Sequence, residues 1–135
     1  MIKNRITIAI ITMVLGSNQL LQAQDWVAPA AADNLKNPFA ENSKATDKGQ
    51  KIYQKLCWSC HGTTGKGDGP AAAALMPSPT NYINERVQSQ SDGALFWKIT
   101  NGSGLMVSYE STLTEEQRWM LVNYIRRLYK EDGLP

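Results

Sequence analysis

The residues best suited to chemistry lie in one short segment, Cys57-Trp58-Ser59-Cys60-His61, which holds both cysteines of the chain and its only histidine. Two thiols at this spacing can each bond one vinyl group of a single porphyrin, and the histidine that follows can bind the iron through a ring nitrogen. The segment therefore predicts covalent attachment of one c-type haem. In this interpretation Cys57 and Cys60 form the thioether bonds, and His61 is the proximal axial ligand.

The same residues allow three other interpretations: a redox-active dithiol, a zinc site and a structural disulfide. A redox C-x-x-C pair is expected beside alternating strands and helices, and the sequence that follows lacks this pattern. Structural zinc needs four ligands, mostly Cys and His, and the chain has three such residues in all. A disulfide between Cys57 and Cys60 can form in an oxidising compartment before haem attachment. The C-x-x-C-H spacing is the more specific signal, so we favour haem.

The second iron ligand largely decides function, and without a second histidine a methionine is expected there. Met120 lies on the apolar face of the last predicted helix, where core packing is its expected role. Met76 comes only 15 residues after His61, a short excursion for a chain that must cross from one haem face to the other. Met106 lies in a glycine-flanked loop with enough chain behind it to reach the distal face. We therefore predict Met106 as the distal ligand, with Met76 as the second candidate.

The N-terminal segment has the order of features that is typical of a secretory signal. Lys3 and Arg5 precede a largely apolar run over 6–15, and a short polar stretch follows, with Ala23 as the cleavage residue. The apolar run is shorter than the roughly 20 residues that span a bilayer, which disfavours an uncleaved membrane anchor. We therefore expect residues 1–23 to be a signal peptide and the mature protein to be exported to the periplasm.

Length and charge set further limits. The chain has 135 residues, which indicates one domain. Removal of Lys3 and Arg5 takes two charges from the formal net charge of +2 and leaves a nearly neutral protein, which argues against a nucleic-acid partner. We expect an extended N-terminal arm over 24–42, where no periodicity is sustained, and one domain over 43–131. A flexible tether is the alternative for the arm.

The segment that leads into the motif is predicted to be a helix, with Ser43 or Thr46 as its N-cap and Cys57 just beyond its end. Lysines recur on its polar side, and another follows the motif. They include Lys48, Lys51, Lys55 and Lys66. These charges can steer an acidic redox partner, and the association rate would then fall with added salt.

The segment after the motif is rich in glycine and proline over 62–79, which predicts a loop that passes close to the porphyrin. A backbone carbonyl in such a loop can accept the second ring N–H of a ligating histidine, fixing the imidazole and raising its basicity. We expect the carbonyl of Pro70 to do this for His61.

Two further helices are predicted. The first opens at Ser91 and ends at Asn101-Gly102. The second begins with a capping box formed by Thr114 and Gln117 and continues to about residue 129.

Over 43–128 the chain resembles the monohaem class I c-type cytochromes, in which a helix leads into C-x-x-C-H and a C-terminal helix crosses it. The resemblance implies an all-α, small cytochrome c fold with three to five helices wrapped around one covalently bound haem. It places Gly49 and Tyr53 against Tyr124 at the helix crossing.

One difference from the family concerns the methionine loop. The axial methionine of these proteins is commonly followed by proline, whereas Met106 is followed by Val107 and the Met-Pro pair is Met76-Pro77. Met76 therefore stays the alternative ligand.

The function that the resemblance implies is one-electron transfer in the periplasm. Thioether ligation raises the reduction potential and closes the iron to dioxygen and peroxide. Such a carrier is not an enzyme, exchanges electrons with a protein donor and acceptor, needs no small-molecule substrate, and is a monomer or a subunit of a complex. The alternatives are a haem c subunit of a membrane-associated respiratory oxidoreductase, and a haem enzyme or sensor with an open distal site.

Overall fold

The computed structural model describes residues 26–132, and the predicted signal peptide lies outside this range. The described chain is helical and contains no strand. Its helices are α1 (Ser43–Leu56), α2 (Trp58–His61), α3 (Glu85–Gln88), α4 (Asp92–Asn101) and α5 (Glu115–Glu131), with two short 3-10 turns, η1 (Ala30–Asn34) and η2 (Ala72–Ala74). The predicted all-α fold is confirmed. None of these helices is long and apolar enough to pass through a bilayer.

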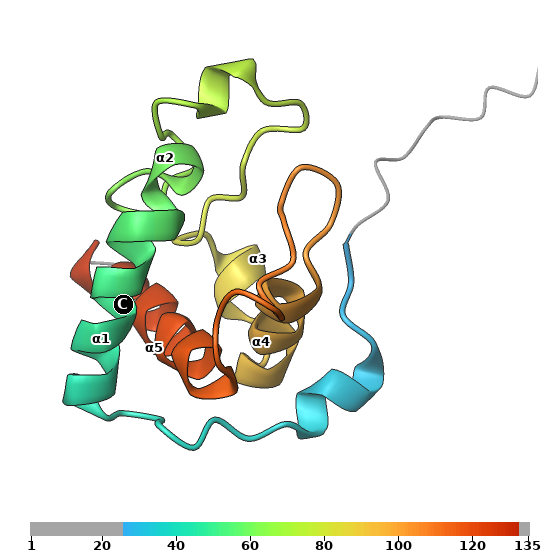
Figure 1. The fold of residues 1–135 in the computed structure, drawn as a ribbon, viewed down its shortest axis with the longest axis vertical. Coiled ribbons are helices and arrows are strands. Elements are labelled where there is room, and N and C mark those ends of the chain that lie inside the picture. The colour runs from blue at the N-terminus through green and yellow to red at the C-terminus, as the bar shows by residue number, and fades with distance from the viewer. Residues whose placement is uncertain (1–25, 133–135) are drawn as a thin grey trace, which may run out of the picture.

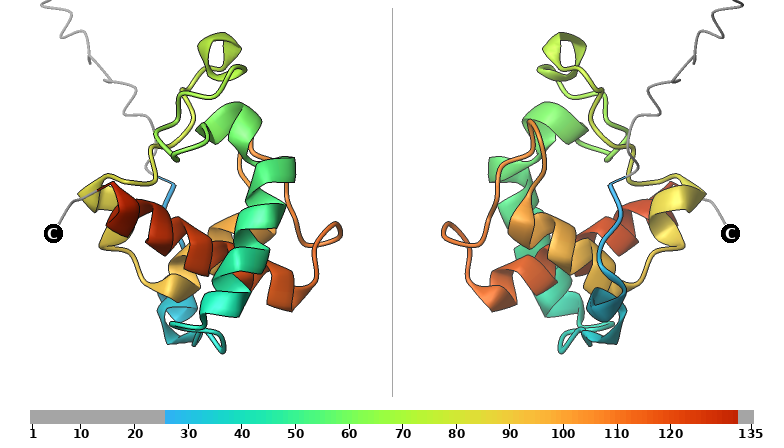
Figure 2. Two further views of the ribbon diagram at one scale, coloured as in Figure 1. Left: turned by 90° about the vertical axis from the view of Figure 1, so that its left-hand side faces the viewer. Right: turned by 90° about the vertical axis from the view of Figure 1, so that its right-hand side faces the viewer.

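The first and last long helices, α1 and α5, cross face to face (Figures 1 and 2). Gly49 makes the close approach possible, because a Cβ atom at this position would lie 2.0 Å from the carbonyl oxygen of Met120. One turn further along α1, the ring of Tyr53 packs edge-on against that of Tyr124 with 5.0 Å between centroids. The crossing that the family resemblance implies is therefore present.

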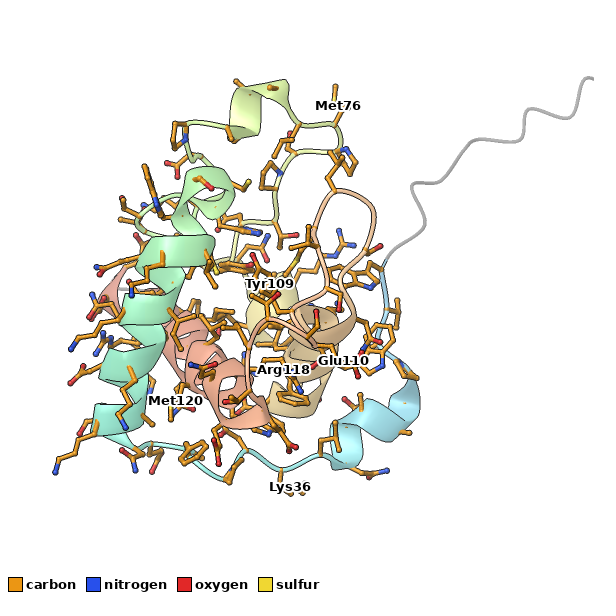
Figure 3. All side chains as sticks on the ribbon, viewed as in Figure 1. Lys36, Met76, Tyr109, Glu110, Arg118 and Met120 are labelled. Carbon is orange, nitrogen blue, oxygen red and sulfur yellow. The ribbon has the colours of Figure 1, made fainter. Side chains whose placement is uncertain are left out.

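The hydrophobic core lies between α5 and the elements packed on it. Val122 and Leu121 of α5 are almost fully buried, and Trp119 stacks on Phe96 of α4 with 4.0 Å between ring centroids. The side chain of Arg118 is also buried and donates to the carbonyl oxygens of Glu110 and Leu113, so it holds the start of α5 to the preceding loop (Figure 3). This core supports the loops that surround the site.

Local sequence signals fix most helix ends. Ser91 caps α4 and the predicted capping box of Thr114 and Gln117 opens α5, as expected. Helix α4 ends at Asn101, and Gly102, which follows it as the C-cap, has a φ of 65° that glycine readily adopts. The N-cap of α1 was wrongly predicted, since Asn42 fills this position and accepts the backbone N–H of Ala45. Asn is as good an N-cap as Ser, so the signal was one residue further upstream.

The N-terminal arm packs along α4 and α5 (Figure 1). The turn η1 interrupts its extended course, and Ala32 lies so close to α4 that a Cβ on Gly93 would meet its carbonyl oxygen. The Asn37 side chain donates to Asp92 at 3.0 Å and to Asn123 at 2.7 Å. These contacts hold described residues of the arm to the helical domain at several points.

Candidate functional site

The predicted haem motif forms the short helix α2, which follows α1 almost without a break. The N–H of Cys57 donates to Tyr53 as a continuation of α1, and the N–H of His61 donates back to the Cys57 carbonyl at 3.0 Å. Both Cys57 and Cys60 are free thiols and half-buried, so the disulfide interpretation has no support here. Burial, with a smaller contribution from the charge of Cys60, raises the pKa of the Cys57 thiol to about 12. Near neutral pH that thiol is protonated.

A buried tyrosine ties the end of the motif to α1. The Tyr53 hydroxyl donates to the carbonyl oxygen of Gly62 at 2.6 Å, and Gly62 directly follows His61. Tyr53 is 1% exposed, and burial is the main reason that its pKa lies well above the usual value. The hydroxyl therefore stays protonated and keeps the turn in place.

Tyr53→Phe is expected to lower the free energy of unfolding of the holoprotein by about 1–3 kcal/mol, because it leaves a buried carbonyl without its donor. Guanidinium unfolding measures this loss. Tyr109→Phe is the matched control, since the Tyr109 hydroxyl donates at 3.1 Å to the exposed Leu56 carbonyl and its loss should cost less than about 1 kcal/mol. Equal losses in the two variants would contradict the anchoring role of Tyr53.

The His61 ring is held by a backbone carbonyl and by an aromatic neighbour. Its Nδ1 lies 3.0 Å from the Thr80 carbonyl oxygen, a geometry in which Nδ1–H donates and Nε2 is the atom that can bind iron. The ring stacks on Tyr82 with 4.4 Å between centroids. Burial lowers the pKa of His61, although the hydrogen bond to Thr80 opposes the shift. Burial is the larger effect, so the net lowering of the pKa favours the neutral imidazole that can bind iron.

Thr80 corrects the prediction for Pro70. The segment around Pro70 is bonded to the backbone of the motif itself: Gly69 donates to Cys60, and Ala71 donates to Ser59. A Cβ on Gly69 would lie 2.3 Å from the Ser59 carbonyl oxygen, so this stretch is pressed against α2. The chain reaches the imidazole only after the proline-rich excursion, at Thr80.

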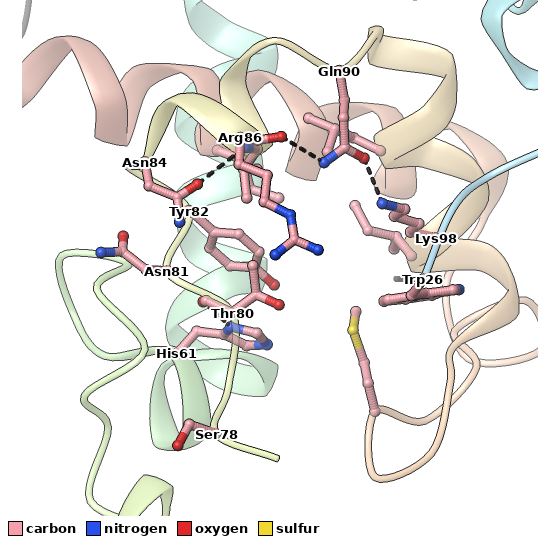
Figure 4. A pocket seen from close by; sticks show the side chains of 15 residues that line it. Trp26, His61, Ser78, Thr80, Asn81, Tyr82, Asn84, Arg86, Gln90 and Lys98 are labelled. Atoms are coloured by element: carbon pink, nitrogen blue, oxygen red, sulfur yellow. Dashed lines mark hydrogen bonds between the residues drawn. The ribbon is translucent and has the colours of Figure 1, made fainter. Parts of the chain in front are cut away.

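The His61 side chain lines a cavity of about 290 Å³ (Figure 4). Met106 lines the same cavity from the loop between α4 and α5. This loop is shaped by paired backbone hydrogen bonds between Ser103 and Met106, at 2.8 and 3.0 Å, and by the N–H of Tyr109, which donates to Ile99 of α4. The structure thus places the imidazole of His61 and the thioether of Met106, two of the predicted axial ligands, in the lining of one cavity.

The other two methionines lie elsewhere. Met76 is 85% exposed at the tip of the proline-rich loop and points away from the domain (Figure 3). Met120 is half-buried on α5, where its backbone meets Gly49 of α1. Neither side chain lines the cavity that His61 shares with Met106.

The site's chemistry fits a haem better than zinc. Two free thiols adjoin a buried imidazole, and the thioether of Met106 lines the same cavity as that ring, which is the donor set of a covalently bound haem. Over residues 26–132 no cluster of three or more His, Cys, Asp or Glu side chains could hold a metal ion by itself. The zinc interpretation therefore has no ligand set in the described part of the chain.

Several residues of the cavity were missed by sequence reasoning. They are Trp26, Thr80, Tyr82, Arg86, Gln90 and Lys98. The loop predicted over 62–79 ends just before Thr80, and the prediction gave no partner for the Thr80 carbonyl. Tyr82 is positioned by its own backbone, whose N–H donates to Gly65 at 2.7 Å. Contacts between such distant residues leave no local pattern.

The predicted lysine surface is partly available for a partner. Lys44, Lys48, Lys51 and Lys55 are all exposed along α1, and we call them the α1 lysine patch. Lys66, which was predicted to join it, instead forms an ion pair with Asp132 at 2.8 Å. This partner raises the pKa of Lys66 through a hydrogen bond and through its charge.

Comparison with known proteins identifies a family and structures of similar fold. The family model described as cytochrome C oxidase, cbb3-type, subunit III matches residues 44–125. A solved chain of the reducing HAO-like protein complex from Kuenenia stuttgartiensis is 29% identical with a TM-score of 0.62, over 71% of this chain and 48% of that one. The chain thus spans about half the length of that relative.

A second solved structure shows the same fold. Cytochrome CL from the marine methylotrophic bacterium Methylophaga aminisulfidivorans is 24% identical with a TM-score of 0.50, over 73% of this chain and 68% of that one. A search of curated protein sequences finds no match.

Proposed function

Because the chain belongs to the c-type cytochrome family whose model covers residues 44–125, and so binds haem c covalently, we propose that it transfers single electrons in the periplasm with His61 and Met106 as axial ligands. The observation that carries the proposal is the cavity that these two side chains share. Cys57, the N-cap of α2, and Cys60 within that helix would hold the haem through thioether bonds. The alternative ligand Met76 is exposed outside this cavity.

Hydrogen bonds keep the two proposed iron ligands in fixed positions, which suits electron transfer. The Thr80 carbonyl fixes the His61 ring, and Tyr53 fixes the turn that carries it. The backbone hydrogen bonds between Ser103 and Met106 fix the loop that carries Met106. When bound, the haem supplies an iron that gains and loses one electron. Ligands that are fixed in advance need little rearrangement between the two oxidation states, and Met106 excludes exogenous ligands from the iron.

The α1 lysine patch supports an acidic protein as electron donor or acceptor. Its four exposed cations lie on one helix that leads directly to the motif. Exposed charges of one sign accelerate encounters with an oppositely charged partner, and salt screens them. The association rate with such a partner should therefore fall as salt is added.

A second candidate is a haem c subunit of a membrane-associated respiratory oxidoreductase. The matching family model is named after a subunit of an oxidase, and one structural relative is part of a protein complex. The same His61 and Met106 would then serve electron transfer inside an assembly. Copurification of the tagged, full-length protein from membranes distinguishes this arrangement from a free carrier.

The test of electron transfer is a spectroelectrochemical titration of the purified holoprotein together with exposure to carbon monoxide. We expect a reversible one-electron transition and no change in the ferrous spectrum on addition of carbon monoxide, because Met106 occupies the distal position. Rapid carbon monoxide binding, or turnover of peroxide, would favour the enzyme or sensor alternative instead.

A further inference from the structure

The cavity has a charged wall that electron transfer by itself does not explain. Arg86 of α3 and Lys98 of α4 line it, and no carboxylate is found among its described lining residues. Figure 4 shows Arg86 reaching into the cavity, with Lys98 on the side away from His61. Two positively charged side chains therefore face one side of the cavity.

Lys98 is held in a defined place. Its Nζ lies 5.4 Å from the centroid of the Trp26 ring and donates to the Gln90 side-chain oxygen. The amide nitrogen of Gln90 donates in turn to the Arg86 carbonyl oxygen at 3.0 Å. This chain of contacts joins the end of α3 to α4 and positions the ammonium group at the cavity wall.

Trp26 comes from the N-terminal arm, which precedes the segment that the family model matches. The arm is attached to the domain by specific bonds: Asp33 accepts the Ser91 hydroxyl, and the Asn123 side chain donates to the Phe39 carbonyl. Trp26 is half-buried at the cavity and carries an indole N–H donor. The arm thus contributes to the wall on which Lys98 lies.

The ligand chemistry that fits this wall belongs to the haem itself. Thioether bonds at Cys57 and Cys60 fix the vinyl edge of the macrocycle at α2, and its two propionate carboxylates leave from a different edge. Carboxylates inside a protein are stabilised by cations and hydrogen-bond donors. We propose that Arg86 and Lys98 bind the haem propionates and that Trp26 completes this site, which makes the N-terminal arm a functional part of the haem pocket.

The proposal depends on haem binding and is independent of which proteins exchange electrons with the chain. A cation close to the iron disfavours the ferric state, and loss of the Lys98 charge also exposes an uncompensated propionate. Loss of the cation and exposure of the propionate charge both favour the ferric state. Lys98→Gln should therefore lower the ferrous-to-ferric ratio at a fixed applied potential by roughly tenfold. This is the size expected for one unit charge about 10 Å from the iron at an effective dielectric constant of about 20.

The experiment uses full-length holoprotein, with spectroelectrochemistry and redox-difference infrared spectroscopy of the carboxylate bands. Lys98→Gln should move both the ratio and a propionate band, and Lys98→Arg should restore the ratio because it keeps the charge. Trp26→Ala should move both in the same direction by less, since it removes the ring beneath Lys98. Lys36→Gln is the matched control: it removes one charge from the exposed part of the same arm and should change the ratio less than twofold.

Two results would overturn the proposal. One is a Lys98→Gln protein whose potential and carboxylate bands match those of Lys36→Gln. The other is a Lys98→Arg protein that is shifted as far as Lys98→Gln, which would show that packing rather than charge is responsible. Retention of the methionine-to-iron optical band in each variant verifies that the fold and the axial ligands are intact.

Discussion

The Met106→Ala holoprotein is expected to lose the weak far-red absorption band that methionine sulfur bound to ferric iron produces. Its reduction potential should fall by more than about 0.1 V, a fraction of the roughly 0.8 V over which axial ligands set haem potentials. The ferrous form should bind carbon monoxide. Each change follows from removing the thioether that lines the same cavity as His61. Optical spectra and spectroelectrochemistry measure all three.

Met76→Ala is the control for this experiment. Met76 is 85% exposed on the proline-rich loop, so its removal should leave the far-red band, the potential and the carbon monoxide response unchanged. If the band persisted in Met106→Ala and vanished in Met76→Ala, the ligand assignment would be reversed. The proline-rich loop would then have to fold over the haem.

Gly49→Ala is expected to lower the free energy of unfolding by about 3 kcal/mol, the upper end of the range for an overpacked core. The added methyl group would lie 2.0 Å from the Met120 carbonyl oxygen. That atom belongs to the backbone of α5, so the two helices must separate. Chemical unfolding of the holoprotein measures the loss, and the yield of haem-loaded protein should fall as well.

The sign of this effect is diagnostic. At an exposed helical position, Gly→Ala stabilises a protein by as much as about 1 kcal/mol, because alanine is the better helix former. Gln54→Ala on the exposed side of α1 is the matched control and should change stability by less than about 0.5 kcal/mol. A Gly49→Ala protein as stable as the native one would mean that the helices cross with more room than the structure shows.

Features with local causes were predictable from the sequence. The haem motif is a fixed spacing of three reactive side chains, and the capping box of α5 joins Thr114 and Gln117 within one turn. The close helix crossing at Gly49 was also foreseen, although from the family resemblance and not from the residues themselves. In each case the determining residues are neighbours or belong to a known pattern.

Features that depend on the path of the chain were not predictable. The carbonyl that orients His61 comes from Thr80, and the choice of Pro70 failed because the loop is first bonded along α2. Helix α3 spans only Glu85–Gln88, too short for a periodic signal, although Asn84 caps it. The contact of Trp26 with Lys98 joins residues far apart in sequence. Only the folded backbone brings such pairs together.

The crossing of α1 with α5 also has a consequence for the order of events in the cell. One partner begins at Ser43 and the other ends at Glu131, so nearly the whole domain must be present before the pair can form. Contacts between such distant segments form late, because a long loop must close first. While the chain is still emerging from a ribosome, α1 therefore has no α5 to pack on, and Cys57 at its end is not yet held by that helix crossing.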